Sequence, residues 1–145
     1  MTTTTYHTDF YAWTRQQTAF LQAEELEKLD LPNLAEEIES MGKSQRREVK
    51  SRLAILLMHL LKWHYQPHMN YGDSWRTTIA TQRREIEIEL DDSPSLRREV
   101  PDFIVYAYSL ARKDAARETN LPLVTFRADC PWTVEEVLNG DWLPT

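Results

Sequence analysis

Cysteine is nearly absent from the sequence, because Cys130 is the only one among 145 residues. A single cysteine excludes an internal disulfide and a four-cysteine zinc site. Cys130 stands between Asp129 and Pro131, with no neighbouring base to activate it as a nucleophile, so we expect an inert thiol. A reducing compartment is compatible with this composition.

Glycine is also scarce, with three residues, and proline contributes seven. An all-β protein needs more glycine-rich turns than this, whereas the helix formers Ala, Leu, Glu, Arg and Gln abound. With 41% hydrophobic and 28% charged residues, the chain has the composition of a globular domain with one core. The composition therefore predicts an all-α fold.

Long apolar runs and a basic leader are both missing. The most apolar run, residues 53–61, is nine residues long and includes His59, which falls well short of the roughly 20 needed to span a bilayer. The first five residues, Met and four Thr, have neither the basic nor the apolar region of a secretory signal. We therefore expect a soluble cytoplasmic protein with no membrane partner, and a disordered N-terminal tail over residues 1–8.

The charge balance and the motif content exclude further classes. The formal net charge of −6 argues against a general attraction to nucleic acid or anionic membranes. The sequence has no glycine-rich phosphate loop, Gly-x-Ser-x-Gly elbow or His-Glu-x-x-His motif. We predict no cofactor, and the sequence favours a non-catalytic protein without deciding the point.

What the chain does contain is one long amphipathic stretch over residues 33–65. Apolar residues recur there at steps of three and four, the spacing of one helix face. A continuous helix of this length would measure about 50 Å, and its lone Gly42 costs about 1 kcal/mol relative to alanine. A stripe this long leaves open a homodimer that buries part of it. The stripe consists of Leu34, Ile38, Met41, Gln45, Val49, Leu53, Leu56, Leu60 and Trp63.

Shorter helices are predicted around this central one. Thr8 or Asp9 caps a first helix. Residues 66–73 form a helix-breaking segment between the central helix and a third helix. Pro101 interrupts the apolar pattern of a fourth helix, so we expect a short helical turn up to Glu99, followed by the main part of that fourth helix. Residues 133–138 form a last short helix. The predicted fold is a single all-α helical bundle, over residues 9–145, of about four main helices around the long central helix.

Several segments together resemble a known family. They are DFYAWT from Asp9, NLAEEIESMGKSQRREVKSRL from Asn33, HLLKWHYQP from His59, SWRTTI from Ser74, QRREI from Gln82, DSPSL from Asp92, CPWTVEEVL from Cys130, and DWLP from Asp141. In order and spacing they resemble the bacterial family called Domain of Unknown Function 29. The resemblance covers nearly the whole chain and implies a helical fold. It implies no reaction, ligand or catalytic residue.

Three histidines are the first candidates for chemistry. His64 and His68 are four residues apart, so they would face one metal ion if the helix continued. Pro67 favours a helix end near Gln66 and spoils that geometry. The alternative is a partly buried, hydrogen-bonded His59 and two solvated histidines near a helix end, where the helix dipole favours cations.

Carboxylates form a second group of candidates. Glu36 and Glu39 on the central helix would meet Glu85 and Glu89 if it packs antiparallel to the third helix, and such clusters bind Mg²⁺ or Mn²⁺. This predicts a divalent-metal-dependent phosphohydrolase. Solvated helix faces explain the same residues, since acidic groups also suit a helix N-terminus.

Arginines form a third group, because guanidinium groups suit phosphates and tryptophan suits base stacking. Glutamates among them would instead form intrahelical ion pairs, and Arg83 would pair with Glu39 if it lies on the inner side of its helix. The candidates for phosphate or nucleic-acid binding are Arg46, Arg47, Trp75, Arg76, Arg83 and Arg84.

The tryptophans Trp63, Trp75, Trp132 and Trp142 suit a ligand pocket, although aromatic residues at helical spacing usually form the core.

With no strong catalytic signature, the sequence favours an interaction module that acts through an unknown protein partner. Such a module predicts an exposed, largely apolar patch. A metal-dependent hydrolase and a weak nucleic-acid or phosphate binder are the alternatives.

Overall fold

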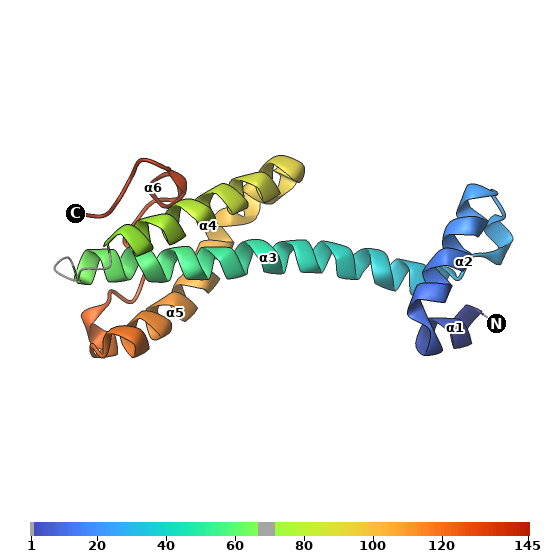
Figure 1. Cartoon of the computed structure of the whole chain (residues 1–145), viewed down its shortest axis with the longest axis horizontal. Coiled ribbons are helices and arrows are strands. Elements are labelled where there is room, and N and C mark those ends of the chain that lie inside the picture. Colours follow the sequence, from blue (N-terminus) through green and yellow to red (C-terminus); the bar gives the residue numbers. More distant parts are fainter. Residues whose placement is uncertain (1, 67–71) are drawn as a thin grey trace. The chain divides into compact units, whose positions relative to one another are not determined.

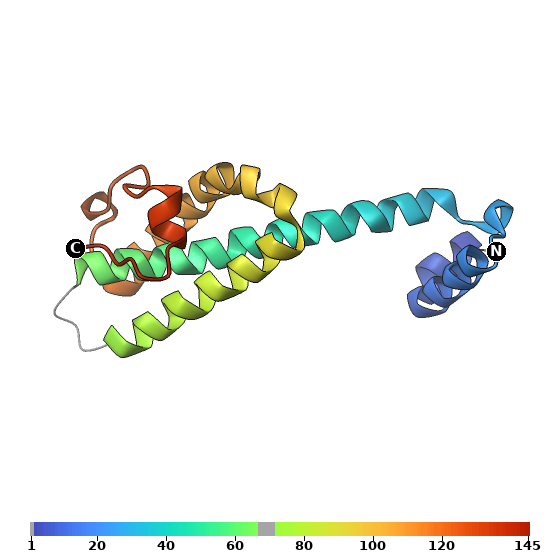
Figure 2. The same cartoon turned by 90° about the horizontal axis from the view of Figure 1, so that it is seen from above.

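The computed structural model describes residues 2–66 and 72–145, and every regular element within these ranges is helical (Figures 1 and 2). The chain divides into two compact units, the N-terminal unit Met1–Ser44 and the C-terminal unit Gln45–Thr145. The central helix α3, Leu31–Tyr65, contributes to both. The sequence-based prediction of an all-α fold with a long central helix is confirmed. The prediction of one domain over residues 9–145 stays a prediction.

The N-terminal unit begins with two helices, α1 (Thr2–Thr8) and α2 (Phe10–Gln22). The expected disordered tail over residues 1–8 differs from the structure, in which Thr2–Thr8 is helical. Asp9 separates the two helices and caps α2, because its carboxylate accepts a hydrogen bond from the backbone N–H of Ala12 over 3.0 Å. Asp9 is one of the two residues predicted as the cap of this helix. Its short carboxylate side chain supplies the hydrogen-bond acceptor that the start of a helix needs.

A short 3₁₀ turn, η1 (Leu26–Lys28), leads from α2 to α3. Asp30 precedes α3, and its carbonyl accepts from the backbone N–H of Leu34 over 2.9 Å. Pro32 lies in the first turn of α3, where its missing N–H leaves no intrahelical bond unmade. The helix then continues through Gly42 without interruption.

The C-terminal unit packs α4 (Gly72–Asp92) and α5 (Val100–Thr119) against the second part of α3. Figures 1 and 2 show α4 and α5 on different sides of this part of α3. Buried leucines on two adjoining faces of α3 explain that arrangement, because each face meets its own neighbour. The buried core residues of α3 are Val49, Leu53, Leu56, Leu57, Leu60 and Leu61.

The other elements follow local signals in the sequence. A 3₁₀ segment, η2 (Pro94–Glu99), precedes α5, as the position of Pro101 predicted, because proline fits the first turn of a helix but not its interior. Asn120 ends α5 in the left-handed conformation, with φ of 58°, a conformation that asparagine tolerates better than most residues. The turn η3 (Leu123–Thr125) follows.

The last helix, α6 (Val134–Leu138), begins with a capping box. The Thr133 hydroxyl accepts from the Glu136 backbone N–H over 3.1 Å, and the Glu136 carboxylate accepts from the Thr133 backbone N–H over 2.9 Å. Two backbone donors that a helix start leaves unpaired are thereby satisfied. Val137 of α6 is buried in the core of the C-terminal unit.

Candidate functional site

The N-terminal unit has a largely apolar groove between α2 and the first turns of α3, with a volume of about 360 Å³. We call it the α2–α3 groove. Four of its large apolar side chains are strongly exposed: Phe10 by 46%, Leu21 by 50%, and Ile38 and Met41 by 65% each. The full lining is Phe10, Trp13, Thr14, Gln17, Thr18, Leu21, Leu34, Glu37, Ile38 and Met41.

The groove lies where the sequence pattern predicted an inward face. Leu34, Ile38 and Met41 belong to the apolar stripe of the central helix, and the stripe is buried only from Val49 onward. The groove is therefore built from residues with the spacing of core positions, and no other described part of the N-terminal unit covers them. Contiguous exposed apolar surface of this kind marks sites of protein–protein or ligand contact.

A polar network lies beside the groove and fixes its geometry. The Trp13 indole Nε1 donates to Asp30 Oδ2 over 3.0 Å, and the Asp30 backbone N–H donates to Gln17 Oε1 over 2.8 Å. Asn33 Nδ2 also donates to Asp30 Oδ2, over 2.8 Å. Hydrogen bonds from Asn33 and Trp13 hold the pKa of the Asp30 carboxyl below its usual value, and burial opposes them. The network ties α2 to the start of α3.

Gln17 is the residue of this network whose side-chain amide is only partly hydrogen-bonded. Its side chain is only 2% exposed, and its Nε2 has no hydrogen-bond partner among the described residues. Buried donors are normally paired, because an unpaired one loses its bonds to water without replacement. Gln17 thus lines the α2–α3 groove, and its unpaired Nε2 atom is buried.

Tyr6 connects α1 to α3 across the same unit. Its hydroxyl donates a hydrogen bond to Glu37 Oε2. This bond to a carboxylate, together with partial burial and the neighbouring negative charges, raises the pKa of Tyr6 to about 12. The Tyr6 ring also packs edge-on against Trp13, with 4.7 Å between ring centroids, and against Phe10 at 5.7 Å. The hydrogen bond from Tyr6 thus holds the Glu37 side chain in place at the groove.

The carboxylates predicted as metal ligands are divided between the two units. Glu36 and Glu39 are exposed on the part of α3 in the N-terminal unit, and Glu39 pairs with Lys43 over 3.3 Å. Glu85 and Glu89 lie half-buried on α4 in the C-terminal unit. Among the described residues, no group of three or more His, Cys, Asp or Glu side chains is placed to hold a metal ion. The hypothesis that these glutamates act together stays a prediction.

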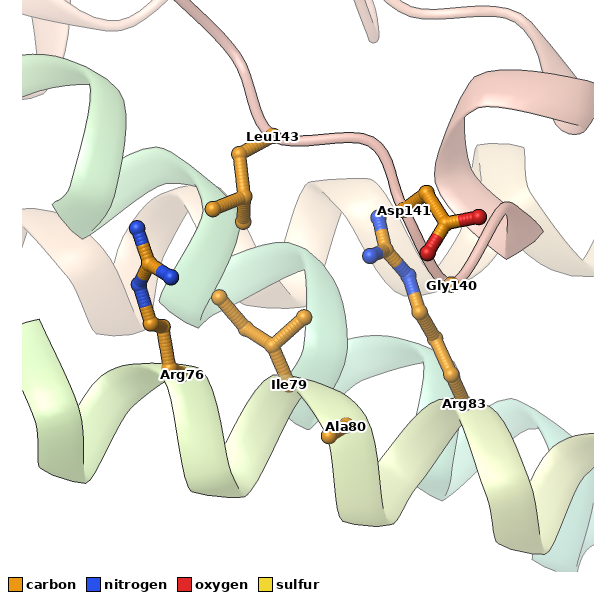
Figure 3. Close-up of a pocket in the computed structure, with 7 residues that line it drawn as sticks. All are labelled: Arg76, Ile79, Ala80, Arg83, Gly140, Asp141 and Leu143. Atoms are coloured by element: carbon orange, nitrogen blue, oxygen red, sulfur yellow. The ribbon is translucent and has the colours of Figure 1, made fainter.

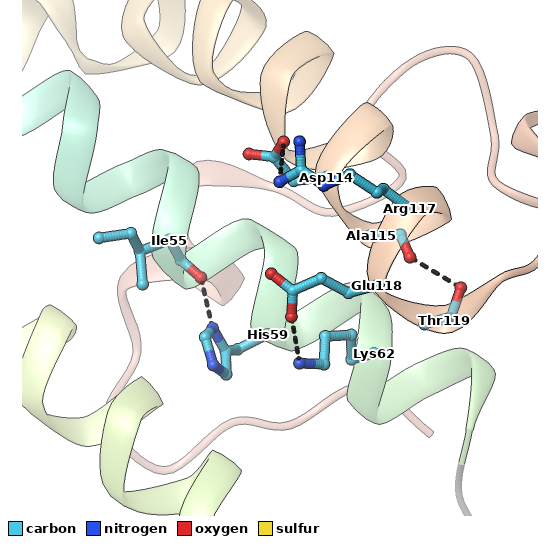
Figure 4. Close-up of polar contacts among 8 residues, drawn as sticks. All are labelled: Ile55, His59, Lys62, Asp114, Ala115, Arg117, Glu118 and Thr119. Atoms are coloured by element: carbon cyan, nitrogen blue, oxygen red, sulfur yellow. Dashed lines mark hydrogen bonds and ion pairs between the residues drawn. The ribbon is translucent and has the colours of Figure 1, made fainter.

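The histidines lie at the far end of α3. His59 is half-buried, and its Nδ1 lies 2.9 Å from the carbonyl of Ile55 (Figure 4), as expected for a hydrogen-bonded packing residue. Burial lowers the pKa of His59, and this backbone hydrogen bond opposes the effect. His64 packs edge-on against Tyr65, and its buried Nδ1 has no partner in the described part of the chain. His68 lies outside the described residues.

Lys62 lies one helical turn beyond His59, and its ammonium group also contacts neighbouring side chains. Its Nζ pairs with Glu118 of α5 over 2.9 Å (Figure 4) and lies 5.0 Å from the centroid of the Trp75 ring of α4. Trp75 is buried, at 8% exposure. A buried indole beneath a paired lysine is not available for base stacking, and its position supports the packing interpretation.

Arg83 has a structural role that the sequence did not specify. It is buried, as expected for an inner position on α4, but its partner is not Glu39. Its Nε donates to the Val137 carbonyl over 2.9 Å and its Nη1 to the Trp142 carbonyl over 2.8 Å. A third bond runs from Nη2 to the Glu136 carbonyl over 3.3 Å. The predicted pairing is wrong because this guanidinium instead donates to carbonyl groups in α6 and in the C-terminal segment that follows it.

A cavity of about 310 Å³ lies between α4 and the C-terminal segment (Figure 3). Arg76, Arg83 and Asp141 contribute charged groups to its lining. The Arg76 guanidinium carbon lies 5.2 Å from the centroid of the Trp63 ring. Two guanidinium groups would suit an anion, but the Asp141 carboxylate opposes one, and Arg83 already donates to three carbonyls.

The other arginine candidates are surface groups. Arg46 pairs with Glu99 over 3.1 Å and covers the Phe103 ring, with 5.6 Å to its centroid. Arg47 is exposed, as is Arg84, whose Nη2 lies 3.9 Å from Glu85. The Arg84–Glu85 pair lies within α4, as expected for an intrahelical ion pair, whereas Arg46 pairs outside its own helix, with Glu99 of η2. Phosphate or nucleic-acid binding by these residues stays a prediction.

Cys130 and Trp132 line a further cavity, of about 530 Å³, beside α5. Burial raises the pKa of the Cys130 thiol, which disfavours the reactive thiolate. Trp132 packs edge-on against Trp142, with 5.7 Å between ring centroids. Trp132 thus lines this cavity, and its ring also takes part in packing.

Sequence reasoning did not single out the α2–α3 groove. Its residues carry a strong helical period, and that period is the usual sign of a buried face. One signal was present, since the apolar stripe of the central helix is longer than a small bundle needs to bury.

Among the described residues, no helix is both long enough and apolar enough to cross a membrane.

Comparisons with known proteins agree with this architecture. Over residues 5–143 the sequence matches the family described as domain of unknown function DUF29. The fold is similar to the crystal structure of an alpha-helical protein of unknown function from Rhodospirillum rubrum, with 26% sequence identity and a TM-score of 0.59. That match covers 94% of this chain and 90% of the other. No curated protein matches the sequence. The chain therefore belongs to the DUF29 family.

Proposed function

We propose that this protein is a protein–protein interaction module whose contact surface is the α2–α3 groove. The observation that carries the proposal is the exposure of Ile38 and Met41, which are 65% accessible on a helix face with the spacing of core residues. Burying such side chains against a partner stabilises the complex by roughly 25 cal/mol per Å² of apolar surface. Neighbouring Phe10 and Leu21 extend the surface that a partner would cover.

The chemistry of the lining also supports binding over catalysis. Eight of its ten residues are apolar side chains or threonines, and the other two are Gln17 and Glu37. Small-molecule and catalytic sites usually combine an apolar cavity with several convergent polar groups. The groove offers one carboxylate, that of Glu37, in an otherwise largely apolar lining, and this composition is typical of the apolar centre of a protein interface.

Affinity capture with matched variants tests the proposal. The full-length protein, the double variant Ile38→Ser/Met41→Ser and the control Val124→Ser are immobilised and exposed to extract from cells that make the protein. Val124 is 86% exposed and lies in the C-terminal unit. We expect a protein that the wild type and the control retain and that the double variant loses. Equal retention by all three would contradict the proposal.

A further inference from the structure

The α2–α3 groove has the dimensions of a helix-binding surface. Along α3 its lining runs from Leu34 to Met41, which corresponds to about 10 Å of helix, and along α2 from Phe10 to Leu21, which corresponds to about 16 Å. Amphipathic helices dock into grooves of this kind through apolar residues at i, i+3 or i+4 and i+7. Residues i and i+7 of such a helix are also about 10 Å apart.

The charge of the N-terminal unit favours a basic occupant. The unit contains eight acidic and three basic residues, a formal charge of −5 out of −6 for the whole chain. Two of its three basic side chains, Lys28 and Lys43, are already paired with Glu25 and Glu39. A surface of this sign attracts cationic partners and repels anionic ones over about 10 Å at moderate salt.

A carboxylate lies in the groove itself. Glu37 is the charged residue of the described lining, and it also accepts the hydrogen bond from Tyr6. That bond uses one of the several acceptor positions that a carboxylate provides. The remaining positions suit a lysine or arginine of the occupant, because bonds between ionised groups are stronger than neutral ones.

A second copy of the chain is a poorer occupant. In a two-fold dimer the same patch meets itself, so two units that each carry a formal charge of −5 would be brought together. Placing like charges together across an interface opposes association.

We infer that the α2–α3 groove binds a basic amphipathic α-helix of another protein, with two to three turns in contact. The apolar residues of that helix pack on Ile38, Met41 and Leu21, and a lysine or arginine lies against Glu37. This inference rests on the proposed interaction function and adds the chemical class of the partner.

Fluorescence anisotropy of labelled peptides tests the inference with the full-length protein. The first peptide is an amphipathic helix of about 18 residues built from leucine and lysine, which is long enough to become helical on binding. The second has the same composition in a scrambled order without an apolar face. The third keeps the apolar face and replaces each lysine with glutamate. Sedimentation equilibrium of the protein alone reports whether it forms a dimer.

We expect the basic amphipathic peptide to bind about tenfold or more tightly than either control peptide, with an affinity that falls as salt rises. Ile38→Ser weakens this binding about tenfold, because it removes an apolar anchor, and Val124→Ser leaves it unchanged. Glu37→Gln weakens it several-fold and reduces its salt dependence. Tyr6→Phe is the matched control for Glu37→Gln, since it removes the hydrogen bond and keeps the carboxylate charge.

Several results would overturn the inference. Equal binding of the scrambled peptide would indicate general charge attraction without a groove, and no binding of the basic peptide would exclude this class of partner. Equal binding of the acidic peptide would leave the interaction function standing and remove its preference for basic helices. A dimer that Ile38→Ser dissociates would assign the groove to a second copy.

Discussion

The Trp13 indole Nε1 and the Asp30 carboxylate form a buried hydrogen bond of 3.0 Å that joins α2 to the start of α3. Asp30 is 7% exposed, and it also accepts from Asn33 in the first turn of α3. One carboxylate thus caps a helix and anchors the aromatic side chain beside the groove. The geometry of the α2–α3 groove depends on this residue.

Replacing Asp30 should therefore destabilise the N-terminal unit. Asp30→Ala removes the acceptor of the Trp13 indole N–H and the cap of α3, and we expect a loss of about 1–3 kcal/mol in the free energy of unfolding. Hydrogen exchange of the Trp13 indole, followed by NMR, measures opening of this unit. Asp30→Asn keeps an oxygen acceptor and should cost less. Unchanged indole exchange in Asp30→Ala would contradict this role.

The same carboxylate predicts an acid-dependent loss of stability. The pKa of Asp30 is lower in the folded protein than its usual value, so its ionisation stabilises the fold above the unfolded-state pKa of about 3.9. That contribution disappears as the pH falls through the lower, folded-state pKa. We expect the difference in urea midpoint between wild type and Asp30→Asn to shrink over this acid range. A difference that stays constant from neutral to strongly acidic pH would show that the charge contributes nothing.

Gly42 lies inside α3, in a position where a side chain would have room. A Cβ atom built there meets no atom within 4 Å. Gly42→Ala should raise the free energy of unfolding by about 0.5–1 kcal/mol, because alanine loses less backbone entropy than glycine in a helix. Urea unfolding followed by far-UV circular dichroism measures the change. A loss of stability would reveal a close contact or a bend at this residue.

Arg83 should be among the most sensitive positions of the C-terminal unit. Arg83→Met keeps much of the apolar stem but leaves the Val137 and Trp142 carbonyls without their donor. We expect a loss of about 2–4 kcal/mol and faster proteolysis of the C-terminal segment. Arg84→Met, at an exposed neighbouring site, should change stability by less than about 0.5 kcal/mol. Equal effects of the two substitutions would contradict the anchoring role.

The sequence predicted those features of the fold that depend on neighbouring residues. Asp9 and Pro101 mark the starts of helices, because each acts on the backbone within a few residues of itself. The helical period over residues 33–65 likewise predicted the central helix, since it requires only the repeat of apolar side chains.

Features that depend on distant residues were not predictable in the same way. The partners of Arg83 are carbonyls more than 50 positions away, and no pattern near Arg83 specifies them. Ile38 and Met41 have the spacing of core residues, and only the three-dimensional structure shows that they are exposed. Periodicity reports that a face is apolar, and it does not report what covers that face.

Site-specific photo-crosslinking tests whether the α2–α3 groove contacts a basic helix of another protein. A photo-reactive amino acid replaces Ile38 in the full-length protein, inside cells that naturally make it, and a second strain carries the same group at Val124. The proposed interaction predicts a discrete adduct from position 38, absent from position 124, in which the attached peptide is a basic amphipathic helix of another protein. No adduct from position 38, or the same adducts from both positions, would contradict it.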